Sequence, residues 1–175
     1  MRKTSKMKIL DFIQNNIRNE FLDVLMQIVT HIGDYGLIWL ITAIVLIAIK
    51  KHRACGIIMA VSLLLCLLIG NIMLKPLIAR PRPFSENSTI TLLIAPPSDY
   101  SFPSGHTMSS FAATTVLFLS SLGRYIKIPA LILSTTIAFS RLYLYVHYPS
   151  DVLAGALMGI ICGVIAYLGL KTRFE

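Results

Sequence analysis

Acidic residues and cysteines are scarce in this 175-residue sequence. Asp and Glu together number 8 against 16 Lys and Arg, and only 14% of the residues are charged. The three cysteines, Cys55, Cys66 and Cys162, lie within or beside long uncharged runs and show no paired spacing. They are therefore expected to behave as small buried hydrophobic residues, and no disulfide is predicted.

The distribution of the positive charge argues against nucleic-acid binding. A formal net charge of +8 is compatible with nucleic-acid binding. However, the basic residues stand at the ends of apolar runs and in short loops, not along one soluble face. Membrane topology explains this distribution better, so we expect membrane lipids and no nucleic acid as partners.

The sequence is rich in long apolar segments. It is 55% hydrophobic with a mean hydropathy of +0.74. Residues 54–74 and 152–170 are uncharged throughout and long enough to cross about 30 Å of hydrocarbon, and residues 107–123 nearly match them. Residues 36–49 and 128–140 are shorter and gain length when flanking lysines snorkel. The sequence predicts an all-α integral-membrane helical bundle with five spans, in a single domain over residues 1–175.

Residues 1–31 predict an amphipathic N-terminal helix. Their apolar residues follow a helical period, whereas Asp23, Gln27 and His31 recur every four residues on another face. The helix either lies at the interface, with Arg2 and Lys3 on lipid headgroups, or crosses as the sixth helix of the core with its polar stripe turned inward. Polar residues interrupt its apolar part, which argues against a cleavable signal peptide.

The short loops predict the orientation of the protein in the plasma membrane. Basic residues follow the first, third and fifth predicted spans, which places them on one side by parity, and such loops are cytoplasmic. The opposite, extracytoplasmic face then receives the end of the second span, the long loop after it and the turn at residues 141–151. These segments hold most of the unusual polar residues of this multi-pass chain.

The first polar motif contains Lys75 and Arg82, separated by prolines that stiffen the chain where it leaves its span. Charges at the edge of an apolar segment are costly unless they have a partner or a function. Taken alone, the motif is better explained by a lysine that snorkels to the interface together with arginines that bind lipid headgroups.

The second motif is Pro-Ser-Gly-His at residues 103–106. Ser104 is expected to cap a helix, and Gly105 allows an anion to approach the free amides at the helix start. His106 then lies beside any bound phosphate. The alternative is an ordinary capped helix with an interfacial histidine.

The third motif predicts a nucleophile. Pro149 suits the first turn of a helix, so His147 stands just outside it and Asp151 can reach back to one ring nitrogen. The other nitrogen is then free to attack, as in a catalytic triad with histidine as the nucleophile. Arg141 can neutralise charge on phosphoryl oxygens through a bidentate contact.

Together the three motifs resemble the signature of the type 2 phosphatidic acid phosphatase superfamily, membrane lipid phosphatases related to vanadium haloperoxidases. The match comprises Lys75, Arg82, Pro83, residues 103–106, Ser140, Arg141, His147 and Asp151. It implies an all-helical core and hydrolysis through a phosphohistidine, without a metal or other cofactor.

The resemblance also implies a role for each residue of the site. His147 attacks phosphorus, His106 protonates the leaving oxygen and later activates water, and Asp151 orients His147. The phosphate-binding residues are Lys75, Arg82, Ser104, Gly105 and Arg141. Arg80 lies outside the signature and is expected to be an electrostatic accessory.

The family leaves the lipid phosphate open. Small bacterial members include undecaprenyl diphosphate phosphatases, phosphatidylglycerophosphate or phosphatidic acid phosphatases, and lipid A phosphatases. An outward-facing site and a short chain favour undecaprenyl diphosphate.

Two other classes of protein would use some of the same residues. A metal site of His106, His147 and Asp151 is disfavoured because three nearby cations would repel a metal ion. A non-catalytic anion or lipid transporter would keep the cations but would not need a paired nucleophile and acid.

Overall fold

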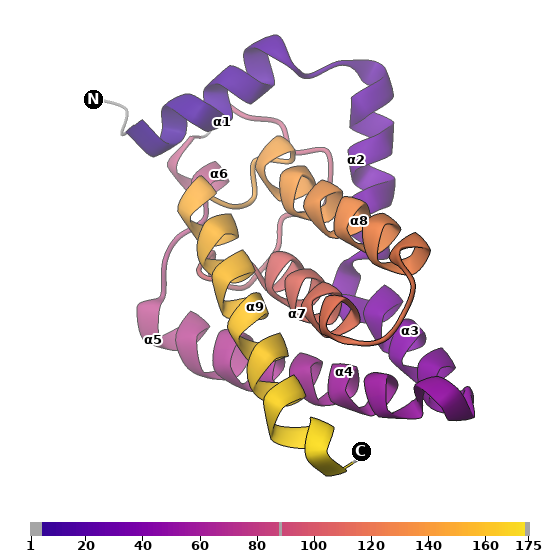
Figure 1. The fold of residues 1–175 in the computed structure, drawn as a ribbon. Coiled ribbons are helices and arrows are strands. Elements are labelled where there is room, and N and C mark those ends of the chain that lie inside the picture. Colours follow the sequence, from indigo (N-terminus) through magenta and orange to yellow (C-terminus); the bar gives the residue numbers. More distant parts are fainter. Residues whose placement is uncertain (1–4, 88, 174–175) are drawn as a thin grey trace.

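The computed structural model describes residues 5–87 and 89–173, and within these ranges every regular element is a helix. The predicted all-α class is therefore confirmed. The expected contacts of Arg2 and Lys3 with headgroups lie outside the described residues. Figure 1 shows the helices α3, α4, α7, α8 and α9 gathered in one bundle, with α1 lying across one end of it.

The predicted N-terminal helix is divided into two. α1 covers Ser5–Asn16 and α2 covers Glu20–Ile32. The division falls at Asn19, whose side chain accepts a hydrogen bond from the amide of Leu22 at 3.0 Å and so begins a new helix. Part of the polar stripe does turn inward, because Asp23 accepts a hydrogen bond from the hydroxyl of Tyr143 at 2.6 Å.

Each of the five predicted spans contains a helix. These are α3 (Leu37–Ala48), α4 (Arg53–Cys66), α7 (Gly105–Leu119), α8 (Arg124–Tyr143) and α9 (Pro149–Leu170). α4 continues through a π-helical stretch, η3 (Leu67–Leu74), and the short α5 (Lys75–Ile78).

The number of membrane crossings stays a prediction. By length and hydropathy, two helical stretches of the described chain qualify as spans, Lys50–Glu86 and Pro149–Arg173. A third arises if Glu20–Ile32 and Asp34–Ala48, which meet at a bend of 42°, form one broken span. In that case α2 would belong to the first crossing and not to a separate amphipathic helix.

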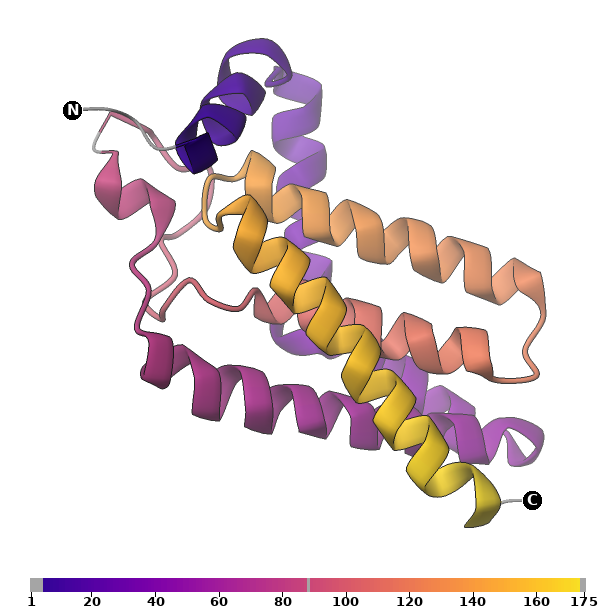
Figure 2. The ribbon, with the colours of Figure 1, turned by 60° about the vertical axis from the view of Figure 1, so that its left-hand side comes forward.

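Glycines bring α7 and α9 into close contact. Gly155, Gly159 and Gly163 recur every four residues along α9 and are buried against α7. A Cβ atom on Gly159 would lie 2.3 Å from the carbonyl oxygen of Met108, so nothing larger than hydrogen fits there. Small residues at this spacing allow helix backbones to approach closely within a membrane. Figure 2 shows α9 crossing α7 obliquely.

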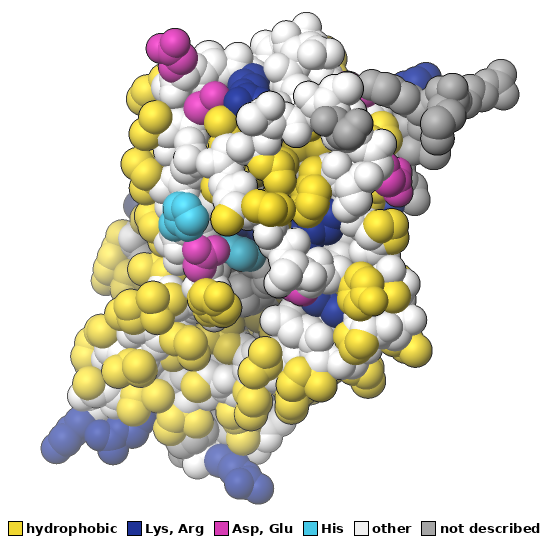
Figure 3. All heavy atoms as spheres, turned by 180° about the vertical axis from the view of Figure 1, so that it is seen from behind, with side chains coloured by type: hydrophobic (Ala, Val, Ile, Leu, Met, Phe, Trp, Pro, Cys, Tyr) yellow, Lys and Arg dark blue, Asp and Glu magenta, His cyan; other side chains and the backbone are white. Residues whose placement is uncertain are grey.

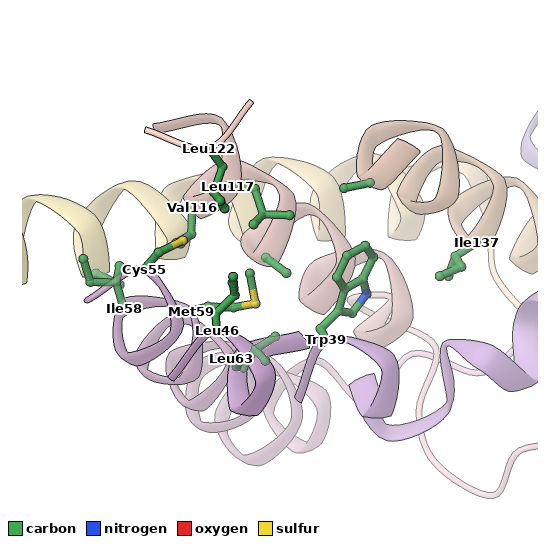
Figure 4. Close-up of a cluster of buried hydrophobic side chains, with 14 of the residues drawn as sticks. Trp39, Leu46, Cys55, Ile58, Met59, Leu63, Val116, Leu117, Leu122 and Ile137 are labelled. Atoms are coloured by element: carbon green, nitrogen blue, oxygen red, sulfur yellow. The ribbon is translucent and has the colours of Figure 1, made fainter. Parts of the chain in front are cut away.

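The hydrophobic core lies between α3, α4 and α7, with α8 at its edge (Figure 4). Met59 and Ile137 are fully buried in it, and Trp39 anchors it by donating its indole N–H to the hydroxyl of Ser110 at 2.9 Å. The outer surface is apolar as well, and Figure 3 shows a broad band of hydrophobic side chains with Lys and Arg at one tip. Such a band is suited to contact with lipid.

Candidate active site

One cavity of about 880 Å³ collects most of the predicted site residues. Six of the eight line it, namely Lys75, Arg82, Gly105, His106, Arg141 and His147. The same cavity is also lined by leucines of α3, α4 and η3, namely Leu40, Leu64 and Leu67. Its lining therefore combines three histidines, His31 among them, and three cations with apolar side chains.

His147 lies in the turn between α8 and α9 and is 1% exposed. As predicted from Pro149, α9 begins at that residue, and His147 stands just before the helix. Arg82 Nη1 lies 3.2 Å from His147 Nε2, so this nitrogen accepts a hydrogen bond through its lone pair. Burial lowers the pKa of His147, and the charges of Arg82 and Arg141 act in the same direction. The imidazole is therefore neutral at pH 7, as a nucleophile requires.

Asp151 faces the other ring nitrogen, but at 3.7 Å from His147 Nδ1 it is too far for a direct hydrogen bond. Its carboxylate instead accepts hydrogen bonds from the hydroxyl of Ser101 and from the amide of Tyr148, the latter at 2.9 Å. Ser101 Oγ is itself 3.5 Å from Nδ1. The orienting influence of Asp151 on His147 is thus electrostatic and shared with Ser101, a residue of the long loop that the motifs did not indicate.

Arg80 is more than an accessory cation. Its Nη1 donates to an oxygen of the fully buried Asp151 and to the hydroxyl of Ser150, the latter at 2.8 Å. Its guanidinium also stacks on Tyr148, 3.9 Å from the ring centroid. A buried carboxylate is costly without a cation, and Arg80 supplies that cation. The only signal in the sequence was a charge between two prolines.

Asp99, in the loop before α7, binds two of the predicted phosphate-binding cations. Its carboxylate accepts hydrogen bonds from Lys75 Nζ and, at 2.6 Å, from Arg82 Nη2. Arg82 Nε also donates to the carbonyl oxygen of Asp99 at 2.8 Å. Burial raises the pKa of Asp99, but the bonds and charges of Lys75 and Arg82 outweigh it and lower the pKa to about 2. In the sequence, Asp99 lies in the long loop after the second predicted span, outside all three motifs.

Arg141, near the end of α8, is 3% exposed. Nη1 donates to the hydroxyl of Thr30 in α2, which fixes one side of the guanidinium. Nε has no hydrogen-bond partner among the described residues, although it is buried. An unpaired donor on a buried cation that lines the cavity is suited to an anion.

The Pro-Ser-Gly-His motif forms the start of α7, as the sequence predicts. Ser104 is the N-cap, and its hydroxyl lies 3.5 Å from the amide of Thr107 and 2.9 Å from the Thr107 hydroxyl. It is fully buried, its side chain caps the helix, and it is not among the residues that line the cavity. Gly105 does line the cavity, and a Cβ there would lie 3.0 Å from Asn71 Oδ1.

His106 has a partner that the motifs did not reveal. Its Nε2 lies 2.9 Å from Oδ1 of Asp34, in the 3₁₀ turn η1 (Asp34–Gly36) between α2 and α3. Asp34 is about 70 residues away in the sequence, and the only hint of a role was its position just after His31, the last residue of the polar stripe.

Comparison with known proteins identifies the family. A helical membrane bundle with these motifs belongs to the class of membrane phosphatases. The chain is a member of the PAP2 superfamily, whose family model matches residues 56–175. The resemblance seen in the sequence is thereby confirmed.

Individual proteins are similar over most of this chain. A protein of Sulfolobus acidocaldarius named undecaprenyl-diphosphatase is 32% identical over 73% of this chain, which spans 62% of that relative's length. The crystal structure of Aquifex aeolicus LpxE is 31% identical, with a TM-score of 0.75 over 93% of this chain and 94% of its own. A PAP2-type phosphatidylglycerolphosphate phosphatase from Bacillus subtilis is 25% identical, with a TM-score of 0.77 over 97% of this chain and 86% of its own.

Proposed function

We propose that this protein hydrolyses a lipid phosphate at the outer face of the plasma membrane, through a phosphohistidine on His147. The observation that carries the proposal is that one cavity is lined both by the histidines and cations of the motifs and by leucines of α3 and α4. A phosphate headgroup and the first part of its lipid chain are expected to occupy one continuous space.

The proposed reaction has two steps. In the first, His147 Nε2 forms a bond to phosphorus while the bond to the leaving oxygen breaks and His106 donates its proton to that oxygen. In the second, His106 takes a proton from water, the water oxygen attacks phosphorus, and the bond to Nε2 breaks to release phosphate. Arg82, already 3.2 Å from Nε2, is expected to transfer its hydrogen bond to a phosphoryl oxygen.

Undecaprenyl diphosphate is the substrate we propose. The extracytoplasmic position expected for the site and the name of the Sulfolobus relative both favour it. The alternative is phosphatidylglycerophosphate or phosphatidic acid, or the phosphate of lipid A. The leucines that line the cavity favour neither an isoprenoid nor an acyl chain, since they accept both.

The decisive experiment measures phosphate release by the purified protein from undecaprenyl diphosphate, phosphatidylglycerophosphate and phosphatidic acid, with and without chelator. We expect metal-independent release, fastest from the diphosphate, and its loss in His147→Ala. Acid quench with ³²P-labelled substrate should trap an acid-labile phosphoenzyme in the wild type alone. Turnover by His147→Ala would refute His147 as the nucleophile. Failure of the wild type to hydrolyse the diphosphate would favour phosphatidylglycerophosphate as the substrate. Binding of lipid phosphates without release of phosphate would favour the transporter.

A further inference from the structure

Asp34 is an unassigned carboxylate in the proposed site. It lies in η1, outside the three motifs and before the residues that match the family model. It lines the same cavity as both histidines, and its side chain is 40% exposed. One carboxylate oxygen is 2.9 Å from His106 Nε2 and the other is 2.9 Å from His31 Nδ1.

The backbone of η1 holds Asp34 in place. Tyr35 has a φ of 54° and Gly36 a φ of 69°, two consecutive residues in the left-handed region. Tyr35 is 99% exposed, so packing of its side chain does not account for a conformation that ordinarily favours glycine. Gly36 lies against Ser109 of α7, with a Cβ on the glycine 3.4 Å from the serine Cβ. The turn is therefore fixed against the first turns of the helix that carries His106.

The contacts of His106 determine which ring nitrogen remains for catalysis. The edge with Nε2 and Cδ2 faces the turn, because Nε2 contacts Asp34 and a Cβ on Gly33 would lie 3.1 Å from Cδ2. Among the described residues, Nδ1 has no hydrogen-bond partner. A carboxylate on Nε2 favours the tautomer in which that nitrogen carries the proton and Nδ1 has the lone pair.

We propose that Asp34 is the positioning residue for His106, holding its ring so that Nδ1 is the atom that exchanges protons with the leaving group and with water. His31, whose side chain is 64% exposed, holds the other oxygen of Asp34 on the solvent side. The inference rests on the proposed phosphatase function, and it gives each of the two catalytic histidines a carboxylate of its own. Asp151 lies 3.7 Å from His147 Nδ1, and Asp34 lies 2.9 Å from His106 Nε2.

A merely structural role for Asp34 predicts a different outcome. Ion pairs on partly exposed side chains contribute little to stability, typically less than about 1 kcal/mol. Loss of such a pair would lower the melting temperature slightly and leave the catalytic step unchanged. A positioning role instead affects kcat, since the imidazole presents the wrong nitrogen or the wrong protonation state.

The test compares Asp34→Asn with the wild type on the lipid phosphate that the wild type hydrolyses fastest. We expect kcat to fall roughly 10- to 100-fold, as for other partners of functional histidines, with little change in KM. Loss of the negative charge also disfavours the imidazolium, so the limb of the pH profile that requires protonated His106 should move to lower pH. Arg141, which also lines the cavity, stays positively charged over that range and should leave the limb in place.

Two further variants make the result specific. Asp34→Glu keeps the carboxylate and should recover part of kcat, whereas Glu20→Gln removes an exposed carboxylate at the start of α2 and should change neither quantity. In a His106→Ala background, Asp34→Asn should cost nothing further, because the residue it positions is gone. If turnover in that background is too slow to measure, the shift of the pH profile in the Asp34→Asn single variant tests the proposal.

The outcomes separate this inference from the proposed function. A wild type with no phosphatase activity would refute the function itself. An active wild type with unchanged kcat and pH profile in a folded Asp34→Asn variant would refute only the role of Asp34. An equal loss from Asp34→Asn with and without His106 would also refute it, because the effect would then not pass through the histidine.

Discussion

The contact between Asp99 and the cations leads to a prediction about phosphate affinity. In the free protein, the Asp99 carboxylate takes the hydrogen bonds of Lys75 and Arg82 that a phosphate would need. Phosphate must therefore compete with a carboxylate that belongs to the chain. Replacing Asp99 by Asn removes the charge while keeping the size of the side chain, so inorganic phosphate and vanadate should bind more tightly.

The structure gives the magnitude. A pKa that falls from 3.8 to about 2 corresponds to about 2.4 kcal/mol in favour of the ionised carboxylate. Since 49% of the Asp99 side chain is exposed, screening by water reduces this to about 1 kcal/mol. The affinity for phosphate or vanadate should then rise about 5-fold.

The pH dependence follows from the direction of the shift. Because the pKa of Asp99 is lowered in the folded protein, its ion pairs stabilise the fold fully above pH 3.8 and are lost as the pH falls towards about 2. Asp99 therefore stays ionised from about pH 5 to about pH 8. The difference in affinity between the wild type and Asp99→Asn should be constant over that range.

The assay is the inhibition constant of phosphate and of vanadate against turnover. Glu20→Gln is the matched control, because it removes one negative charge from the exposed start of α2. Equal or weaker inhibition of Asp99→Asn would refute the reasoning. It would mean that Asp99 arranges Lys75 and Arg82 for phosphate and does not compete with it.

Three further predictions concern Arg141, the helix contact and the general acid. Arg141→Lys should lower kcat roughly 10²-fold, because an ammonium cannot replace the two-pronged guanidinium contact; unchanged steady-state kinetics would contradict this. Gly159→Ala should cost about 1–3 kcal/mol and lower the melting temperature in detergent, because its Cβ meets the carbonyl of Met108, whereas Gly169→Ala, with nothing within 4 Å, should not. His106→Ala should lose roughly 10²-fold or more on phosphatidic acid but less on undecaprenyl diphosphate, whose leaving group is more stable as an anion; equal losses would mean that protonation of the leaving group is not its main role.

The sequence predicts the helices of this fold well because the signals are local. Long uncharged runs, Ser104 before a helix and Pro149 at the start of another each act within a few residues of the element they define. The break at Asn19 was missed because the apolar period continues across it. The glycines of α9 were readable in principle, since their spacing of four residues is itself a packing signal.

In the candidate site too, local contacts could be predicted from the sequence and contacts between distant segments could not. His147, Pro149 and Asp151 form one short segment, so their proximity is nearly forced by the chain. The chain does not force the distance of 3.7 Å between Nδ1 and the carboxylate, because Ser101 and Arg80 come from other segments and each binds one oxygen of Asp151. A motif thus predicts which residues meet, whereas the surrounding chain decides which atoms bond.

The residues that the motifs missed share a physical task. The three motifs supply Lys75, Arg82 and Arg141, each at most 8% exposed, and buried cations of one sign repel one another unless carboxylates lie nearby. Asp99 binds two of these cations directly, Asp151 is paired with Arg80, and Asp34 faces the same cavity. When a phosphate binds Lys75 and Arg82, it displaces the Asp99 carboxylate. The carboxylate can then be solvated by water, because half of its side chain is already exposed. The exchange of one anion for another then leaves the charge of the cavity balanced. This is why the carboxylate that competes with the substrate is expected on a partly exposed loop and not on a buried helix.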